Sequence, residues 1–308
     1  MHLDEVGRNM ALVVVGSIAL DTVITPRGRS DNAVGGSATF FSLAAARKTR
    51  VGIVGVAGKD FPAFAIADFE KMHIDLQGLE IREGKTFRWG GIYRINMKER
   101  ETLYTDLNVF EHFSPTLPRE YRSCRMLFLA NIHPALQLRV LDQMENKPLV
   151  GLDSMNLWIK TAKATLIEAV KRSDIIIIND EEIIQLTEEQ YLADAVLHIQ
   201  SLGPHTVIVK KGKYGAELFH KKNHAVYPIC PEKALVDPTG AGDTFAGGFM
   251  GYLDSLNKPI PDFYDYHEAM IYGTVLASFL VESFSTDRLT SLNDEEIKTR
   301  LRKFKDRL

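Results

Sequence analysis

The sequence predicts an α/β fold: a mostly parallel central sheet with helices on both faces, to which a small β lid is added. Short β-branched runs alternate with stretches of helical periodicity, which favours strand–helix–strand units with right-handed crossovers. The strands are continuous apolar runs, of which 175–178 is the clearest. A strand needs such a run when both faces of its sheet are covered. A stretch of strict alternation, at 87–97, predicts the lid.

The elements of the central unit are expected in regular succession. Strands are expected over 12–16, 51–56, 126–130, 149–153, 174–178 and 206–210. Helices are expected over 37–47, 64–72, 135–145, 162–171 and 191–201. A charged amphipathic helix should begin after Asn293, because Asn293 and Glu296 have the spacing of a helix cap. No internal repeat or long linker interrupts the series.

The lid is predicted from residues 85–106, where the helical pattern stops. Phe87, Trp89 and Tyr93 fall on one face of an alternating run, and 97–100 is a plausible hairpin turn before a return strand. An isolated hairpin is marginally stable, so it must pack against another segment. A sheet extension without function is the alternative. We expect an α/β core over 1–20, 31–84 and 108–308, and a lid over about 21–30 and 85–107.

Composition limits the class of protein. The chain has 308 residues, 45% of them hydrophobic and 25% charged, which suits a well-buried globular protein. Its net charge of −3 gives no basic excess, so nucleic acid is not an expected partner. Cys124 and Cys230 lie far apart without ligand-like spacing, and we expect buried thiols in a reducing compartment.

The apolar stretch at 10–20 predicts a buried strand. Asp4 and Glu5 precede it, whereas a signal peptide would begin with basic residues. No segment approaches the roughly 18 apolar residues that a membrane span needs. We therefore expect no membrane association and a cytoplasmic location.

The most informative motif lies at 237–248, where Gly240, Ala241 and Gly242 precede Asp243 and a small-residue apolar run. This pattern predicts a tight turn that leads into a buried helix. The first amides of a helix have no intrahelical partner and lie at its positive end, so the turn can bind an anion. We infer that Asp243 accepts a proton from a hydroxyl that attacks a phosphate. A sharp turn with Asp as a helix cap is the alternative.

The twelve residues 237–248 resemble the C-terminal signature of the ribokinase family, also called the phosphofructokinase-B family of carbohydrate and nucleoside kinases. The resemblance implies a ribokinase-like fold and transfer of the γ-phosphoryl group of ATP to a hydroxyl of a sugar or nucleoside. It implies Asp243 as the catalytic base, Gly240, Ala241 and Gly242 as the anion hole, and Mg²⁺ as a cofactor. It leaves open a K⁺ site at Asp237 and a homodimer formed through the lid.

Motifs near the N-terminus resemble the family's acceptor site. Asp21 follows the first strand, where a carboxylate can hold sugar hydroxyls, although a solvated loop Asp is the alternative. Gly35 and Gly36 resemble the family's Gly-Gly motif, at which the backbone approaches the acceptor. Many members place Asn four residues after the second Gly. This chain has Phe40 there, which puts the sugar contacts in doubt and suggests an unusual acceptor.

Two further motifs resemble the nucleotide site of the family. Asn179 and Glu182 match its Asn-x-x-Glu motif, which helps to place Mg²⁺ and the phosphates. The same spacing is that of a helix capping box, and the two interpretations are compatible. Lys210 stands where Thr or Lys meets ATP phosphates, and Gly212 belongs to a segment that lines the nucleotide site. A surface lysine is the alternative for Lys210.

Other functions remain open. The stretch 52–60 fails the Walker pattern, because Asp60 follows Lys59 where Ser or Thr is required. A kinase of a vitamin-like alcohol, of the hydroxymethylpyrimidine type, is one alternative. A non-catalytic sugar or nucleotide sensor on the same fold is another. Phe40, Phe41 and the aromatic lid suit a flat ring, which places nucleosides slightly above hexoses.

Overall fold

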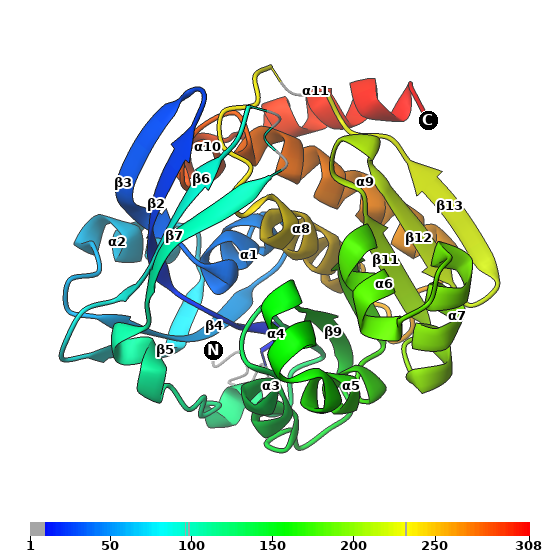
Figure 1. Ribbon diagram of the computed structural model, residues 1–308, viewed down its shortest axis with the longest axis horizontal. Coiled ribbons are helices and arrows are strands. Elements are labelled where there is room, and N and C mark those ends of the chain that lie inside the picture. Colours follow the sequence, from blue (N-terminus) through cyan, green and yellow to red (C-terminus); the bar gives the residue numbers. More distant parts are fainter. Residues whose placement is uncertain (1–9, 96, 98, 232) are drawn as a thin grey trace, which may run out of the picture.

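The computed structural model describes residues 10–308 except 96, 98 and 232. Within these residues the large sheet has nine strands in the order β13-β12-β11-β10-β9-β8-β1-β4-β5 (Figure 1). Pairing is parallel from β11 to β5, and β12 and β13 add antiparallel strands at one edge. The strands are β1 (Leu12–Val15), β4 (Val51–Gly58), β5 (Asp75–Arg82), β8 (Met126–Leu129), β9 (Leu149–Asp153), β10 (Ile175–Asn179), β11 (Thr206–Lys210), β12 (Ala216–His220) and β13 (Asn223–Tyr227).

The six predicted strands are confirmed, each with ends within two residues of the expected ones. Three strands were missed, namely β5, β12 and β13. β5 and β13 are the two edge strands of the sheet and β12 lies next to β13, and in all three exposed and buried positions mix. Edge strands lack the continuous apolar run by which the central strands were found.

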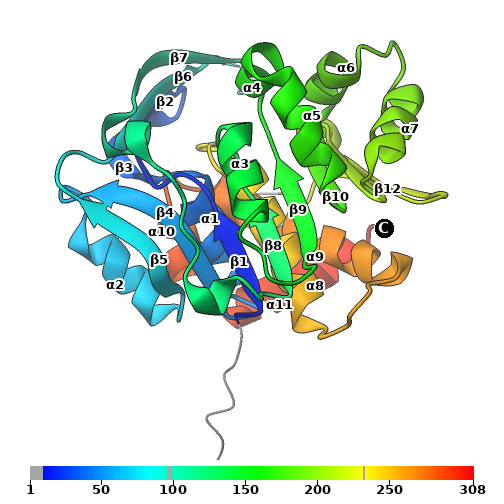
Figure 2. The same cartoon turned by 90° about the horizontal axis from the view of Figure 1, so that it is seen from below.

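Helices cover both faces of the large sheet, as predicted (Figures 1 and 2). One face packs on α1 (Ser37–Ala45), α2 (Ala63–Lys71), α8 (Ala241–Ser255), α9 (Phe263–Leu280), α10 (Asp287–Ser291) and α11 (Asp294–Lys305). The other packs on α3 (Pro134–Leu141), α4 (Asn156–Thr161), α5 (Lys163–Lys171), α6 (Asp180–Thr187) and α7 (Leu192–Leu202). Ile175 and Ile177 of β10 belong to the first core, and Ile176 and Ile178 to the second. Two cores on one strand explain its unbroken apolar run.

A second sheet, of four strands in the described residues, has the order β3-β2-β6-β7. Its strands are β2 (Ala19–Thr25), β3 (Gly28–Gly35), β6 (Phe87–Tyr93) and β7 (Arg100–Asp106). It joins the two segments expected to form the lid, because β2 pairs with β6. It also runs on to Gly35, five residues past the expected end of the first segment. The expected turn at 97–100 includes Lys98, which lies outside the described residues.

In the described part of the chain, no helix combines the length and the apolar character that a membrane crossing requires.

Candidate active site

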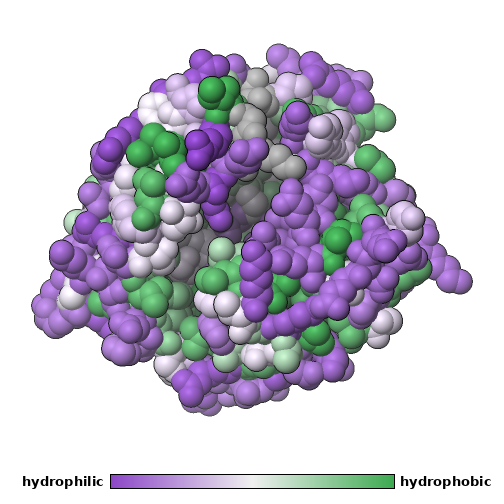
Figure 3. Space-filling view, viewed as in Figure 1, coloured by the Kyte–Doolittle hydropathy of each residue, from purple (hydrophilic) through white to green (hydrophobic). Residues whose placement is uncertain are grey.

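Several predicted site residues converge at the carboxyl ends of the central strands. Asn179 ends β10 and Lys210 ends β11, and the N-terminus of α8, with Asp243, lies at the same end of the sheet. Asp153, which was not predicted, ends β9 beside them. Asp21 reaches this region because β2 begins four residues after β1 ends. Ligands of open α/β sheets bind at this end. Figure 3 shows this face of the molecule hollowed near its centre, with hydrophilic side chains along the edge of the hollow.

The glycine turn before α8 has the predicted form. Gly240 lies at the N-cap with φ of 78°, in the left-handed region that favours glycine. A Cβ on Gly240 would lie 2.4 Å from Cδ2 of Phe40, so the Phe40 ring packs directly under the turn. Phe40 is only 2% exposed, so its side chain supports the turn; the acceptor contact expected of Phe40 stays a prediction. The ring fills the space beside Gly240, and no local sequence pattern reveals that these two residues are in contact.

The amides of the turn are not equivalent. Ala241 donates its N–H to the carbonyl of Pro238 at 3.2 Å, which differs from the expectation that all three amides are available to an anion. In the part of the chain that the structure describes, the amides of Gly240 and Gly242 have no such partner. These two therefore remain as candidate anion donors.

Asp243 lies in the first turn of α8 and is partly exposed. Burial raises its pKa to about 7, and the nearby charge of Asp153 adds to the rise. Lys210 and Arg100 act in the opposite direction, as does the backbone N–H of Asp243 itself. A general base works best when its pKa lies near the operating pH, so this environment suits a carboxylate that accepts a proton.

Lys210 lies beside the turn. Its Nζ is 3.4 Å from Oδ1 of Asp153 and 3.1 Å from where a Cβ on Gly242 would be. Burial works against the lysine charge, but Asp153, Glu182 and Asp243 outweigh burial and raise the pKa of Lys210. The ammonium group is therefore held charged at the edge of the glycine turn. A surface position for Lys210 is excluded by this pairing.

Asp153 is a functional candidate that the sequence analysis missed. It is 5% exposed, and burial raises its pKa although Lys210 opposes the rise. The sequence contained a signal for this residue: Asp153 is the last residue of a predicted central strand, and a carboxylate at the carboxyl end of such a strand can reach a bound ligand. Asp21 was found by that same reasoning.

Asn179 and Glu182 form the predicted capping box at the start of α6. Oδ1 of Asn179 accepts the N–H of Glu182 at 2.7 Å, and Oε2 of Glu182 accepts the N–H of Asn179 at 3.1 Å. Glu182 is also buried within the field of Lys210 and Asp153, and burial is the main cause of its raised pKa. The cap thus holds a buried carboxylate close to the lysine.

Asp21 lies beside Gly35 and Gly36, the two glycines that were expected to share the acceptor site with it. A Cβ on Gly35 would clash with Oδ2 of Asp21 at 2.1 Å, and the N–H of Gly36 bonds to the carboxylate. Gly36 itself has φ of 98°. The pKa of Asp21 is raised to about 7; burial is the largest cause, and the negative charges of Asp237 and Asp243 add to the rise. The expected acceptor residues therefore adjoin the expected base.

Asp237 and Gly212 occupy different surroundings. Asp237 is 2% exposed, and Oδ1 accepts the N–H of Thr239 at 2.8 Å. The backbone of Ser285 also bonds to it, while burial raises its pKa. Gly212, two residues past β11, has φ of 55° and open space where a Cβ would stand. Among the described residues no three His, Cys, Asp or Glu side chains are grouped to hold a metal ion directly.

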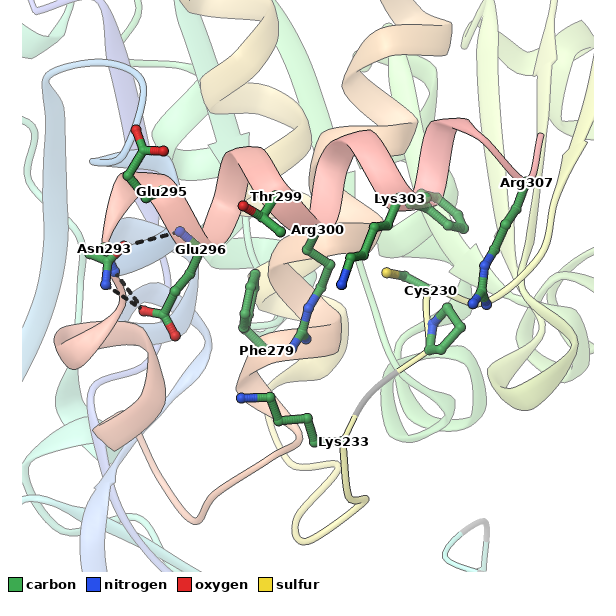
Figure 4. A pocket seen from close by; sticks show the side chains of 12 residues that line it. Cys230, Lys233, Phe279, Asn293, Glu295, Glu296, Thr299, Arg300, Lys303 and Arg307 are labelled. Atoms are coloured by element: carbon green, nitrogen blue, oxygen red, sulfur yellow. Dashed lines mark hydrogen bonds between the residues drawn. The ribbon is translucent and has the colours of Figure 1, made fainter.

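A cavity of about 560 Å³ lies elsewhere, between α11, the end of α9 and the loop after β13 (Figure 4). Phe279 and Phe304 contribute apolar surface, and Arg300 and Lys303 contribute charge. None of the expected site residues lines it, so it is separate from the site described above.

Comparison with known proteins bears on both fold and function. A family model described as pfkB family carbohydrate kinase matches residues 11–292. A cytidine kinase of Thermococcus kodakarensis is 29% identical over 259 residues, which cover 82% of this chain and 91% of that protein. The structure of a Methanocaldococcus jannaschii nucleoside kinase, a member of the ribokinase family, matches with a TM-score of 0.76 at 19% identity, over 96% of this chain and all of that one.

A ribokinase structure from Giardia lamblia matches with a TM-score of 0.80 at 17% identity, again over 96% of this chain and all of that chain. Identities this low speak for the fold alone. Together with the sheet order and the helices on both faces, they show that the predicted ribokinase-like architecture is correct.

Proposed function

The chain belongs to the pfkB family of carbohydrate kinases, and on that premise we propose that it transfers the γ-phosphoryl group of ATP to a hydroxyl of a nucleoside or sugar. One observation carries the proposal. Asp243 lies at the N-terminus of α8 with a pKa near 7, between the half-buried Lys210 on one side and Asp21 with its glycines on the other. An acid–base group, an anion site and a hydroxyl-binding carboxylate therefore meet in one place.

The donor side is formed by the turn and its lysine. ATP phosphates would bind at the N-terminus of α8, where Gly240 and Gly242 offer amides and Lys210 offers a charge. The surrounding carboxylates, Asp153 and Glu182 among them, suit a Mg²⁺ ion that binds phosphate oxygens and retains water. When bound, such an ion neutralises charge on the phosphates. A K⁺ ion at Asp237 stays a prediction.

The acceptor side would be formed by Asp21, which orients the hydroxyls. The hydroxyl proton passes to Asp243 as the oxygen attacks the γ-phosphorus, and ADP leaves. Transfer of this kind relies on positioning and charge stabilisation. The small sheet, acting as a lid, would exclude water and limit hydrolysis of ATP.

A nucleoside is the favoured acceptor. A relative that matches this chain over 91% of its own length is named a cytidine kinase, and Trp89 and Tyr93 lie on the face of the small sheet that carries Asp21. Aromatic rings suit a flat base. A ribokinase of Staphylococcus aureus is 27% identical over 71% of this chain, so a sugar is the second candidate. A hydroxymethylpyrimidine-type alcohol and a catalytically silent sensor are outcomes that the test below separates.

The test is release of ADP in the presence of Mg·ATP and single acceptors: cytidine, other nucleosides, ribose, fructose and hydroxymethylpyrimidine. Turnover that is highest with a nucleoside supports the proposal. Highest turnover with hydroxymethylpyrimidine moves the chain to the vitamin-kinase alternative. If wild-type protein binds ATP and a nucleoside but releases no ADP with any acceptor, the kinase proposal fails and the sensor remains.

The role of Asp243 has its own prediction. Asp243→Asn should keep the fold and ATP binding but lose about 10²- to 10⁴-fold in kcat, the range typical of a lost general base. Asp194→Asn, on the exposed start of α7, is the matched control and should retain full activity. Wild-type turnover by Asp243→Asn would end the assignment of this residue as the base.

A further inference from the structure

Arg100 is the first residue of β7 and lies on the inner face of the small sheet. It pairs with Tyr93 across the antiparallel β6–β7 ladder, and Trp89 of β6 pairs in turn with Asp21 of β2. Paired residues project to the same face. The guanidinium carbon of Arg100 lies 5.1 Å from the centre of the Trp89 ring. Arg100, Trp89 and Asp21 therefore share the face that looks onto the site.

This end of the small sheet touches the catalytic turn. The hydroxyl of Thr239, one residue before Gly240, donates to the Tyr93 hydroxyl oxygen at 3.3 Å. The end of β6 and the start of β7 thus lie over the turn that leads into α8 (Figure 1). The cross-strand partner of Tyr93 is carried to the same place.

The charge of Arg100 reaches both halves of the site. Burial raises the pKa values of Asp21, Glu182 and Asp243, and Arg100 is among the groups that oppose each rise. These carboxylates come from β2, α6 and α8. Of these three carboxylates, Lys210 opposes the rise in pKa at Glu182 and Asp243, and it is not among the main influences on Asp21. Arg100 therefore lies between the acceptor side and the nucleotide side.

Arg100 is exposed, lies over the Trp89 ring and shares a hydrogen bond with the Tyr93 hydroxyl. Among the residues that the structure describes, no carboxylate forms an ion pair with its guanidinium. Arg94, the residue that follows β6, forms an ion pair with Glu101 at 2.9 Å. A guanidinium group presents a planar fork that matches phosphate oxygens, and a transferred phosphoryl group spreads charge over three oxygens.

We propose that Arg100 is a catalytic residue whose guanidinium binds oxygens of the phosphoryl group during its transfer. The inference rests on the proposed kinase function. The acceptor oxygen forms its bond to phosphorus as the bond between phosphorus and the β–γ bridging oxygen breaks, ADP keeps that electron pair, and Asp243 takes the hydroxyl proton. Arg100 neither gains nor loses a proton. Because Arg100 belongs to the small sheet, phosphoryl transfer would depend on the small sheet lying over the turn before α8.

The test compares Arg100→Ala, Arg100→Lys and the control Arg94→Ala in steady-state ADP release with the best acceptor. Arg100→Ala should lose at least about 10²-fold in kcat, toward the range of arginines that stabilise this transition state. Arg100→Lys should recover part of the loss, and Arg94→Ala should match wild type. Added guanidinium chloride, at millimolar concentration, should partly restore Arg100→Ala but not Asp243→Asn. A purely structural arginine would show no such rescue.

Two results would overturn the proposal: kcat of Arg100→Ala within about threefold of wild type, or a loss confined to the KM of the acceptor. Failure of the proposed function is distinguishable, because wild-type protein would then release no ADP with any acceptor. In that case calorimetry decides the role of Arg100. Arg100→Ala should lose the preference of wild-type protein for a non-hydrolysable Mg·ATP analogue over Mg·ADP, and an unchanged preference ends the inference.

Discussion

Asp21 has an environment that penalises its own charge. It is 7% exposed and faces the carboxylates of Asp237 and Asp243, with the N–H of Gly36 and the charge of Arg100 as the opposing groups. Its pKa rises from 3.8 to about 7 on folding. A carboxylate with a raised pKa binds its proton more tightly in the folded state. Its contribution to stability is therefore fully present below about pH 4 and is lost as the pH rises toward 7.

Asp21→Asn should for this reason stabilise the ligand-free protein while it impairs acceptor binding. We expect a gain in the free energy of unfolding on the order of 1–3 kcal/mol at pH 8 and a smaller gain at pH 5. Thermal unfolding at both pH values measures it. Asp31→Asn is the control, because the bond to Arg29 lowers the pKa of Asp31 and no gain at pH 8 should appear. A gain for Asp21→Asn that is the same at both pH values contradicts the argument.

At the scale of elements, α6 and α11 offer a matched pair of helix starts. Asn179 and Glu182 form a capping box on α6, and Asn293 and Glu296 form the same box on α11. The first box lies within the field of Lys210, whereas the second lies outside the site. The two caps therefore separate the structural role of such a glutamate from a role in nucleotide binding.

Glu182→Gln should leave α6 intact, because Gln can also cap at this position. It should raise the Mg²⁺ concentration needed for half-maximal activity, since one carboxylate beside the phosphate site is removed. Glu296→Gln makes the same change on α11 and should leave the Mg²⁺ dependence unaltered. Titration of Mg²⁺ at fixed ATP compares them. An unchanged titration for Glu182→Gln would reduce this residue to a helix cap.

At the scale of the whole molecule, the site lies between two sheets. Asp21 and Arg100 come from the small sheet, and Asp153 and Lys210 come from strands of the large one. Carboxylates outnumber cations among the described residues that face one another here. Ligands that bind across this centre add contacts to both sheets and compensate part of the repulsion.

A non-hydrolysable ATP analogue with Mg²⁺, together with an acceptor, should therefore raise the melting temperature by more than the sum of the separate shifts. The first ligand orders the two sheets relative to each other, so the second binds a prepared site. Without Mg²⁺ the shift from the analogue should shrink, because the phosphates then meet the carboxylates uncompensated. Shifts that add without excess, measured by differential scanning fluorimetry, would argue against ordering of the small sheet as a lid.

The correct predictions from the sequence rested on short local patterns. The apolar run 175–178 predicted a strand buried on both faces, and in the structure its residues alternate between the two cores. The glycines before Asp243 predicted a tight turn at the start of a helix, and Gly240 adopts the left-handed conformation there. Edge strands such as β5 escaped notice, because one-sided burial leaves no continuous apolar signal.

The sequence by itself determined the α/β architecture and the family, and it singled out Asp243 as the candidate base, because periodicity, glycine turns and caps act over a few neighbouring residues. Only the tertiary structure decided what surrounds that carboxylate. Asp153 is far from Lys210 along the chain yet lies 3.4 Å from it, and Phe40 packs under Gly240 from another helix. Such contacts arise when sheets and helices are packed together. The charge and pKa of each site group follow from that packing, which no short stretch of sequence contains.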